Sequence, residues 1–368
     1  MLLLAHLCLC LSEPGLGPIT QLTFPSQFHK AGESYISPDR SKVIFQAIPQ
    51  PEAGQPQEPS EHYGMYLADL VPGNQPAFTL ENIRRISPEG SANTCGWFHP
   101  LDEGLVLYAS TLGPPVAQDT PGYQRASGKY RWAFPPQMRI VKQRIDSENA
   151  RPEPLIGDDA SYQAEGSWSP DGRHVLFADL ATGDGDLYAQ DLVTGHRAHL
   201  VSAPGYDGGP FFSPDGKRII WRGDRRSDHL LQLFVGELAF DEAGTIIGLS
   251  RTFQLTDDEH VNWAPFWHPD GKRLVFATSR MGHHNYEVFE IDAASGTPDE
   301  PTRYGTTSRR ITQGEGFDGL PAFSPDGQYM IWTGQRGSSG TSQLFIAPFK
   351  RASPPPTRPG NPPEGHAH

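Results

Sequence analysis

The stretch Gly208–Arg222 reads GGPFFSPDGKRIIWR, and close copies of it occur elsewhere in the chain. EGSWSPDGRHVLFA begins at Glu165, WAPFWHPDGKRLVFA at Trp263 and GLPAFSPDGQYMIWT at Gly319. In each copy a proline presets φ at the first corner of a turn, an aspartate can bind its own backbone, and a glycine accepts the positive φ that leads into the next strand. Each copy therefore predicts a β-hairpin with a tight Pro-Asp-Gly turn.

Aligning the chain on the turn proline gives six units. The prolines are Pro38, Pro100, Pro170, Pro214, Pro269 and Pro325. A large apolar side chain stands two residues before each proline, and a β-rich run such as KVIFQA or KRLVFA follows each turn. These runs do not alternate strictly between apolar and polar residues, so we expect both faces of the sheets that they form to be covered.

Each unit continues with a third strand candidate, and five of the six also have a fourth. The sixth lacks one, because after Phe349 the chain becomes RASPPPTRPGNPPEGHAH. The strand-like ITQLTF at Ile19–Phe24 matches the missing strand in type. The pattern predicts an all-β fold, a six-bladed β-propeller of four-stranded blades whose ring is closed by the N-terminal strand completing the last blade. Residues 19–349 would form this single domain, and 351–368 a disordered Pro-rich tail.

The Ser-Pro-Asp-Gly hairpin, the β-branched and aromatic run after it and a terminal QLT or RIT strand resemble the TolB-type, WD40-like propeller repeat. The whole pattern, including SANTCGWFHP and GYDGGPFFSPDG, is similar to the stand-alone exported TolB-like proteins of bacteria, which lack the N-terminal domain of TolB. This resemblance implies the propeller fold. It does not choose a function, because the repeat also occurs in propellers of peptidases and polysaccharide lyases.

Charge and the N-terminus restrict the partners and the location. The chain has 43 acidic and 30 basic residues and a formal net charge of −13, with no Lys/Arg cluster, so we expect no nucleic-acid partner. Residues 1–12, MLLLAHLCLCLS, form an apolar run that is too short to span a bilayer and is typical of a secretory signal. We expect a monomer exported to a periplasm or the cell exterior, with no integral membrane segment.

The two faces of the predicted ring differ in sequence. The Pro-Asp-Gly turns all lie on one face, the turn face, whereas the variable connections, including GPPVAQDTPGYQRASGKYRWAFPP, lie on the other, the loop face. Long loops on a rigid scaffold often carry binding sites. The candidate binding residues on the loop face are Glu33, Asn93, Glu165, Asp207, His260, Asn262, Trp263 and Asp318. Most of the polar ones stand five or seven residues before a turn proline, so symmetry should gather them around the channel mouth; the alternative is that they are solvated and cap backbone amides.

No catalytic motif accompanies these residues. The chain has no G-x-S-x-G, no H-E-x-x-H and no phosphate-binding glycine loop ahead of a helix. We therefore expect a non-enzymatic propeller that binds a protein or peptide partner at the channel mouth without a cofactor. The alternatives are Ca²⁺ or another divalent cation at the mouth, a sugar or other small ligand, and a metal-dependent lyase of the oligogalacturonate type with His29, His260 and His283 as candidate ligands.

Overall fold

The computed structural model describes residues 13–51, 60, 62–74, 77–116, 122–124, 129–131, 134–147, 149–158, 160–293, 308–336 and 340–350. The expected leader, 1–12, and the expected tail, 351–368, lie outside these described residues. The described part of the chain is all-β, and it contains no helix that could cross a membrane.

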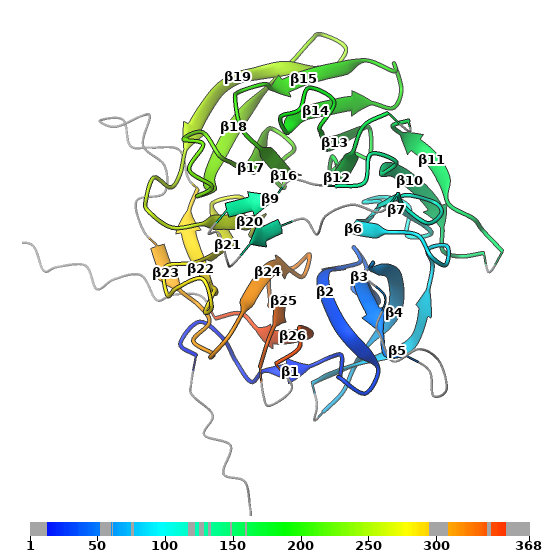
Figure 1. Ribbon diagram of the computed structural model, residues 1–368, viewed down its shortest axis with the longest axis vertical. Coiled ribbons are helices and arrows are strands. Elements are labelled where there is room, and N and C mark those ends of the chain that lie inside the picture. Colours follow the sequence, from blue (N-terminus) through cyan, green and yellow to red (C-terminus); the bar gives the residue numbers. More distant parts are fainter. Residues whose placement is uncertain are drawn as a thin grey trace, which may run out of the picture.

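Six four-stranded antiparallel sheets stand around a common axis as the blades of a propeller (Figure 1). Blade one contains β2 (Phe28–Ile36), β3 (Lys42–Pro49), β4 (Gly64–Pro72) and β5 (Phe78–Arg85). Blade two contains β6 (Asn93–Phe98), β7 (Leu105–Ser110), β10 (Arg139–Arg144) and β11 (Glu153–Ile156). Blade three contains β12 (Gln163–Trp168), β13 (His174–Asp179), β14 (Asp186–Asp191) and β15 (Arg197–Val201). Blade four contains β16 (Asp207–Phe212), β17 (Arg218–Gly223), β18 (Gln232–Phe240) and β19 (Ile246–Gln254). Blade five contains β20 (Asn262–Trp267), β21 (Arg273–Thr278), β22 (Glu287–Asp292) and β23 (Ser308–Arg310). Blade six contains β24 (Asp318–Phe323), β25 (Tyr329–Gly334), β26 (Gln343–Pro348) and β1 (Thr20–Gln21).

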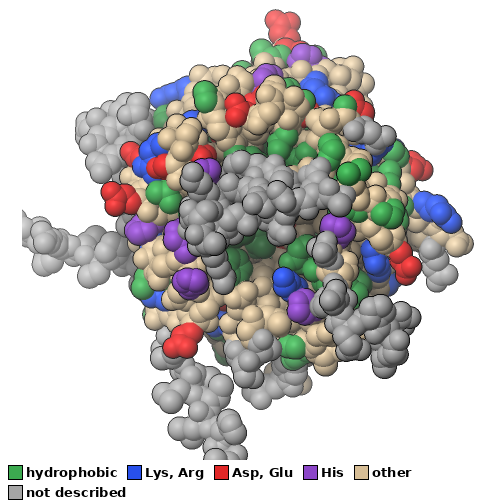
Figure 2. Space-filling view, in the orientation of Figure 1, with side chains coloured by type: hydrophobic (Ala, Val, Ile, Leu, Met, Phe, Trp, Pro, Cys, Tyr) green, Lys and Arg blue, Asp and Glu red, His purple; other side chains and the backbone are tan. Residues whose placement is uncertain are grey.

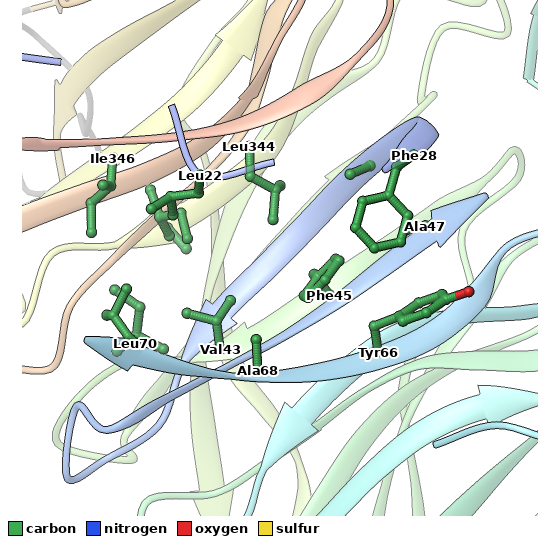
Figure 3. Packing of buried hydrophobic residues seen from close by; sticks show 14 residues of the cluster. Leu22, Phe28, Val43, Phe45, Ala47, Tyr66, Ala68, Leu70, Leu344 and Ile346 are labelled. Carbon is green, nitrogen blue, oxygen red and sulfur yellow. The ribbon is translucent and has the colours of Figure 1, made fainter. Parts of the chain in front are cut away.

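The first described strand closes the ring, as the sequence predicts. Strand β1 pairs antiparallel with β26, with Thr20 opposite Ile346, and the Leu22 amide then donates to the Leu344 carbonyl at 2.8 Å. Leu22, Leu344 and Ile346 of this last blade pack in one apolar cluster with Val43 and other side chains of blade one (Figure 3). Closure thus buries the adjoining faces of the first and last blades against each other and leaves fewer free strand edges.

The repeated turn has the chemistry expected of it. In blade four the Asp215 carboxylate accepts hydrogen bonds from the Ser213 hydroxyl and the Lys217 amide, and Gly216 has φ 69°. Blade one has Arg40 where the clean repeats have glycine; it adopts φ 65° and its guanidinium pairs with Asp326 in the turn of blade six. The turns are therefore built from their own side chains, which explains why they change little between blades.

Every innermost strand contains a β-bulge at the same place. The register between the first and second strands of each blade shifts at this place, as between Gly208 and Phe211 in blade four, and in blade one it shifts a second time between Phe28 and Lys30. The residue five before the turn proline has positive φ in all six blades: Glu33 (39°), Cys95 (55°), Glu165 (59°), Gly209 (59°), Ala264 (48°) and Leu320 (50°). Only one of them is glycine, so five blades hold a side chain in a strained conformation next to the axis.

Candidate functional site

The axial channel is blocked part of the way along by four aromatic side chains, Tyr35, Trp97, Phe211 and Phe266, which we call the aromatic plug. The ring centroids of Tyr35 and Trp97 lie 4.7 Å apart, those of Trp97 and Phe211 5.3 Å, and those of Phe211 and Phe266 5.3 Å. On the loop side of the plug is a cavity of about 770 Å³, the axial cavity. On the turn side a smaller cavity of about 270 Å³ is lined by the plug and the six turn prolines.

The axial cavity lies under the long connections of the loop face. In the view of Figure 1 the hairpin of β8 (Gly122–Gln124) and β9 (Lys129–Arg131) projects over the ring of blades. Figure 2 shows the same face of the molecule, which has a hollow near the centre. The hairpin belongs to the long insertion of blade two, and the same insertion supplies Val116 and Phe134 to the cavity wall. Phe134 stacks on Tyr162 of blade three, with ring centroids 4.5 Å apart. The variable loops therefore shape the mouth, while the repeated strands shape the base.

All six bulge residues line the axial cavity. We call Glu33, Cys95, Glu165, Gly209, Ala264 and Leu320 the bulge ring. Its members are polar on one side of the axis, in blades one to three, and small or apolar in blades four to six. A ring that is symmetric in backbone is thus asymmetric in chemistry, which is what recognition of an asymmetric ligand requires.

Glu165 is the anchor of a saturated cluster. Its carboxylate accepts hydrogen bonds from the Tyr206 hydroxyl at 3.0 and 2.9 Å and from the Gly209 amide at 2.6 Å, and it forms an ion pair with Arg222. A side chain on Gly209 would overlap the Arg222 guanidinium, which explains why this one position of the bulge ring is glycine. The neighbouring carboxylate raises the pKa of Arg222 further above its ordinary value despite burial.

Glu33 has a different environment. Its carboxyl accepts hydrogen bonds from the Tyr35 hydroxyl at 3.3 Å and the Thr94 hydroxyl at 3.2 Å, and the Cys95 thiol also donates to it. Burial raises the pKa of Glu33, and the nearby Glu165 adds to that effect. Burial together with the Glu33 charge also raises the pKa of Cys95 well above its ordinary value, so its thiol stays protonated.

Three candidates that stand seven residues before a turn proline, Asp207, Asn262 and Asp318, do not line the axial cavity. Asp207 accepts hydrogen bonds from Trp221 Nε1 at 2.9 Å and from Arg225, and Asp318 does so from Trp332 Nε1 at 2.9 Å and from Arg336. Burial outweighs the cation and raises the pKa of Asp207 to about 6. Asn262 of blade five donates to Gln232 on β18 of blade four and to Asp258 in the connection between these blades. Asp207 and Asp318 therefore connect parts of their own blades, and Asn262 connects blades four and five.

The eight sequence candidates therefore separate into two groups. Glu33, Asn93, Glu165 and Trp263 line the axial cavity, whereas Asp207, His260, Asn262 and Asp318 do not. Asn93 lines it while donating its amide protons to the Tyr63 and Ser91 carbonyls, both at 2.9 Å. A single polar ring, expected from symmetry, is not what the structure contains. Its cavity-facing ring also includes Cys95 and is supported by Arg222, and neither was a candidate. Cys95 stands five residues before Pro100, the spacing of Glu33 and Glu165, so this spacing could have found it, whereas Arg222 lies at an ordinary position of its strand.

Of the three candidate metal-ligand histidines, His260 and His283 lie near each other by blade five, whereas His29 lies on β2 in blade one. His283 lies close to His260 and His284, and burial together with these neighbours lowers the pKa of His283. Its Nδ1 is 3.2 Å from the Tyr286 hydroxyl. Within the ranges that the structure describes, no group of three or more His, Cys, Asp or Glu side chains is arranged to hold a metal ion.

Comparison with known proteins finds TolB proteins and a peptidase among the matches. Residues 143–305 match the family model of the TolB β-propeller domain. Dipeptidyl-peptidase 5 of Porphyromonas gingivalis is 33% identical over 163 residues, covering 40% of this chain and 21% of that protein. The Tol-Pal system protein TolB of Francisella tularensis subsp. mediasiatica is 25% identical over 188 residues, covering 51% of this chain and 38% of that protein. The crystal structure of TolB from Acinetobacter baumannii superposes with a TM-score of 0.50 at 17% identity, over 88% of this chain and 64% of that one.

The extent of these matches limits what they transfer. The chain spans between 21% and 50% of the length of the curated relatives that it matches first. The solved structure is a likeness of fold. The matched part, 143–305, runs from the end of β10 to the connection after β22, so it contains blades three and four completely and the first three strands of blade five.

Proposed function

We propose that this chain, a TolB-like six-bladed β-propeller, binds a protein or peptide partner on its loop face, with part of the partner inserted into the axial cavity. The observation that supports the proposal is the cavity itself: about 770 Å³, blind at the aromatic plug and lined at its mouth by the variable loops. Binding sites of this size are usually concave, largely apolar and furnished with a few placed polar groups.

The lining of the axial cavity has that composition. Aromatic and apolar side chains form most of the wall, among them Tyr63, Phe134, Trp263 and Phe317. Such side chains dominate the energetically important centres of protein interfaces because they bury much area at small entropic cost. At the rim, Lys30 is exposed and Val116 is 61% exposed, so a partner can reach the cavity from the loop face.

A binding role fits the chemistry of the cavity better than catalysis does. A nucleophilic cysteine needs a thiolate, and the neighbouring Glu33 and burial both oppose thiolate formation at Cys95. The Glu165 carboxylate is occupied by Tyr206, Gly209 and Arg222, which leaves it poorly placed to accept a proton from a substrate. The groups in the cavity therefore suit recognition without a cofactor.

We further propose that the protein is exported and acts as a monomer. The support for export is the apolar run of residues 1–12, which lies outside the described residues. Fractionation of expressing cells, with and without this run, tests the location, and light scattering of the purified protein tests the oligomeric state.

Two matched valines test the binding face. Val116 lies at the cavity mouth and Val193, 77% exposed, lies in the turn between β14 and β15 on the turn face. A photo-crosslinking residue at Val116 should give one discrete adduct with a partner that can be identified, purified and titrated, and Val116→Asp should weaken that titrated affinity by roughly tenfold. The same two changes at Val193 should give no adduct and no loss. Equal results at the two valines would reject the loop face as the binding surface.

A further inference from the structure

We propose that the axial cavity holds a primary ammonium group on an apolar stem, with the ammonium against Glu33. This inference rests on the proposed function and deepens it, because it names the chemical group of the partner that enters the cavity. It follows from a difference between the two carboxyl groups of the bulge ring.

The Glu165 carboxylate already has a cation, whereas Glu33 has only neutral donors. Glu165 is ion-paired with Arg222, so the two charges cancel in direct contact. The donors to Glu33 are two hydroxyls, those of Tyr35 and Thr94, and the thiol of Cys95. A deep carboxylate without a cation in contact is unfavourable, and a ligand that supplies the cation removes this penalty.

The position of Glu33 suits such a ligand. Glu33 stands on the β-bulge of β2 with φ 39°, and its side chain stays partly exposed because the cavity reaches it. A second acceptor lies on the adjacent strand β3, where Gln46 lines the cavity and its Oε1 receives no hydrogen bond from the described residues. An ammonium group carries three N–H donors and needs this kind of acceptor set.

Aromatic rings complete the cavity around these acceptors. Tyr35, Tyr63, Trp263 and Phe266 all line it together with Glu33. The faces of such rings attract an organic cation, most strongly where water is displaced, and their bodies bury an alkyl stem. An anion would meet Glu33 and Glu165, and a hard metal ion would need six to eight oxygen ligands, which the described residues do not assemble.

The charged and titratable groups around Glu33 set the pH dependence. They are Tyr35 on β2, Cys95 on β6, Glu165 on β12, Arg222 on β17 and Tyr63 in the connection before β4. Burial raises the pKa of Glu33, so its charge is lost early as the pH falls. Tyr35 and Cys95 have pKa values raised well above their ordinary range and stay neutral, and Arg222 stays charged. Ammonium binding should therefore weaken as the pH falls through the pKa of Glu33.

Calorimetric titration of the full chain with matched probes tests the proposal. The probes are n-hexylammonium and Nα-acetyl-lysine amide, with 1-hexanol and Nα-acetyl-norleucine amide as neutral counterparts. We expect the ammonium probes to bind roughly tenfold or more tightly than the neutral ones, and Glu33→Gln, which keeps an acceptor for Tyr35 and Thr94, to lose that roughly tenfold preference and its pH dependence. Glu103→Gln, an exposed glutamate at the turn of blade two, should bind as the unchanged chain does.

The probes and the variants distinguish the possible outcomes. Binding of the lysine amide at least as tightly as hexylammonium indicates a polypeptide source of the ammonium, and binding of hexylammonium alone indicates a small amine. Equal affinity for charged and neutral probes, or an unchanged preference in a folded Glu33→Gln variant, overturns the proposal. A partner that still crosslinks at Val116 while no ammonium binds would keep the proposed function and reject this inference. Ammonium binding without a crosslinked partner would keep this inference and reject the proposed partner binding on the loop face.

Discussion

Two sets of acidic side chains stand only two residues apart on the innermost strands, and they have opposite surroundings. Asp207 and Asp318, seven residues before the turn proline, are 0% and 2% exposed and accept hydrogen bonds from a tryptophan and an arginine of their own blade. Glu33 and Glu165, five residues before it, face the axial cavity. The first set is paired within its own blade. In the second set Glu165 is already paired with Arg222, and Glu33 receives hydrogen bonds from neutral donors.

The β-bulge is the physical cause of this difference. In a regular strand, residues two apart point to the same side. In blade four, however, Asp207 pairs with Gly223 while Phe211 pairs with Ile220, so one extra residue lies between them and the alternation changes phase. The residue in the bulge takes positive φ and turns its side chain into the cavity. A local backbone irregularity thus separates carboxylates that are buried inside a blade from carboxylates that face the axial cavity.

The largest expected effect is the loss of a structural carboxylate. Asp207→Ala leaves Trp221 Nε1 buried without an acceptor and Arg225 without its partner. We expect the free energy of unfolding to fall by about 3 kcal/mol, measured by urea denaturation. Asp184→Ala, which removes an exposed carboxylate from a loop of blade three, should change it by less than about 0.5 kcal/mol. If the two variants were equally stable, the Asp207 cluster would have no structural role.

The sequence predicts the ring well and the site only in part. Repeated Pro-Asp-Gly turns and the strand at Ile19–Phe24 are enough for six blades and their closure, because turn chemistry and strand pairing are local and repeated. The site depends instead on where each bulge falls, and the bulge has no glycine signature in five of the six blades. Spacing alone therefore groups Asp207 with Glu165, and it passes over Arg222, whose role comes from a contact between blades three and four.

An effect of intermediate size should appear in the pH dependence of stability. Since the pKa of Glu33 is raised in the folded state, the native chain binds more protons than the unfolded chain between the two pKa values. Stability then falls as the pH rises through that interval and levels off above the folded pKa. Glu33→Gln should remove this fall, so its stability relative to the unchanged chain should increase with pH in urea titrations from about pH 4 to pH 8. A constant difference at all pH values would show that Glu33 is not perturbed by folding, and Glu103→Gln serves as the exposed control.

The smallest effect concerns the strain of the bulge itself. Ala264 has φ 48°, a region where a side chain is disfavoured by about 1–2 kcal/mol and glycine is not. In Ala264→Gly this relief offsets the lost methyl burial and the added chain entropy, so we expect the free energy of unfolding to change by less than about 0.5 kcal/mol. Ala277, fully buried on the neighbouring regular strand β21, has no such strain, and Ala277→Gly should lower the free energy of unfolding by about 1–2 kcal/mol. Equal losses at the two positions would mean that the bulge conformation stores no strain, and the distinction between the two sets of residues would then rest on side-chain contacts alone.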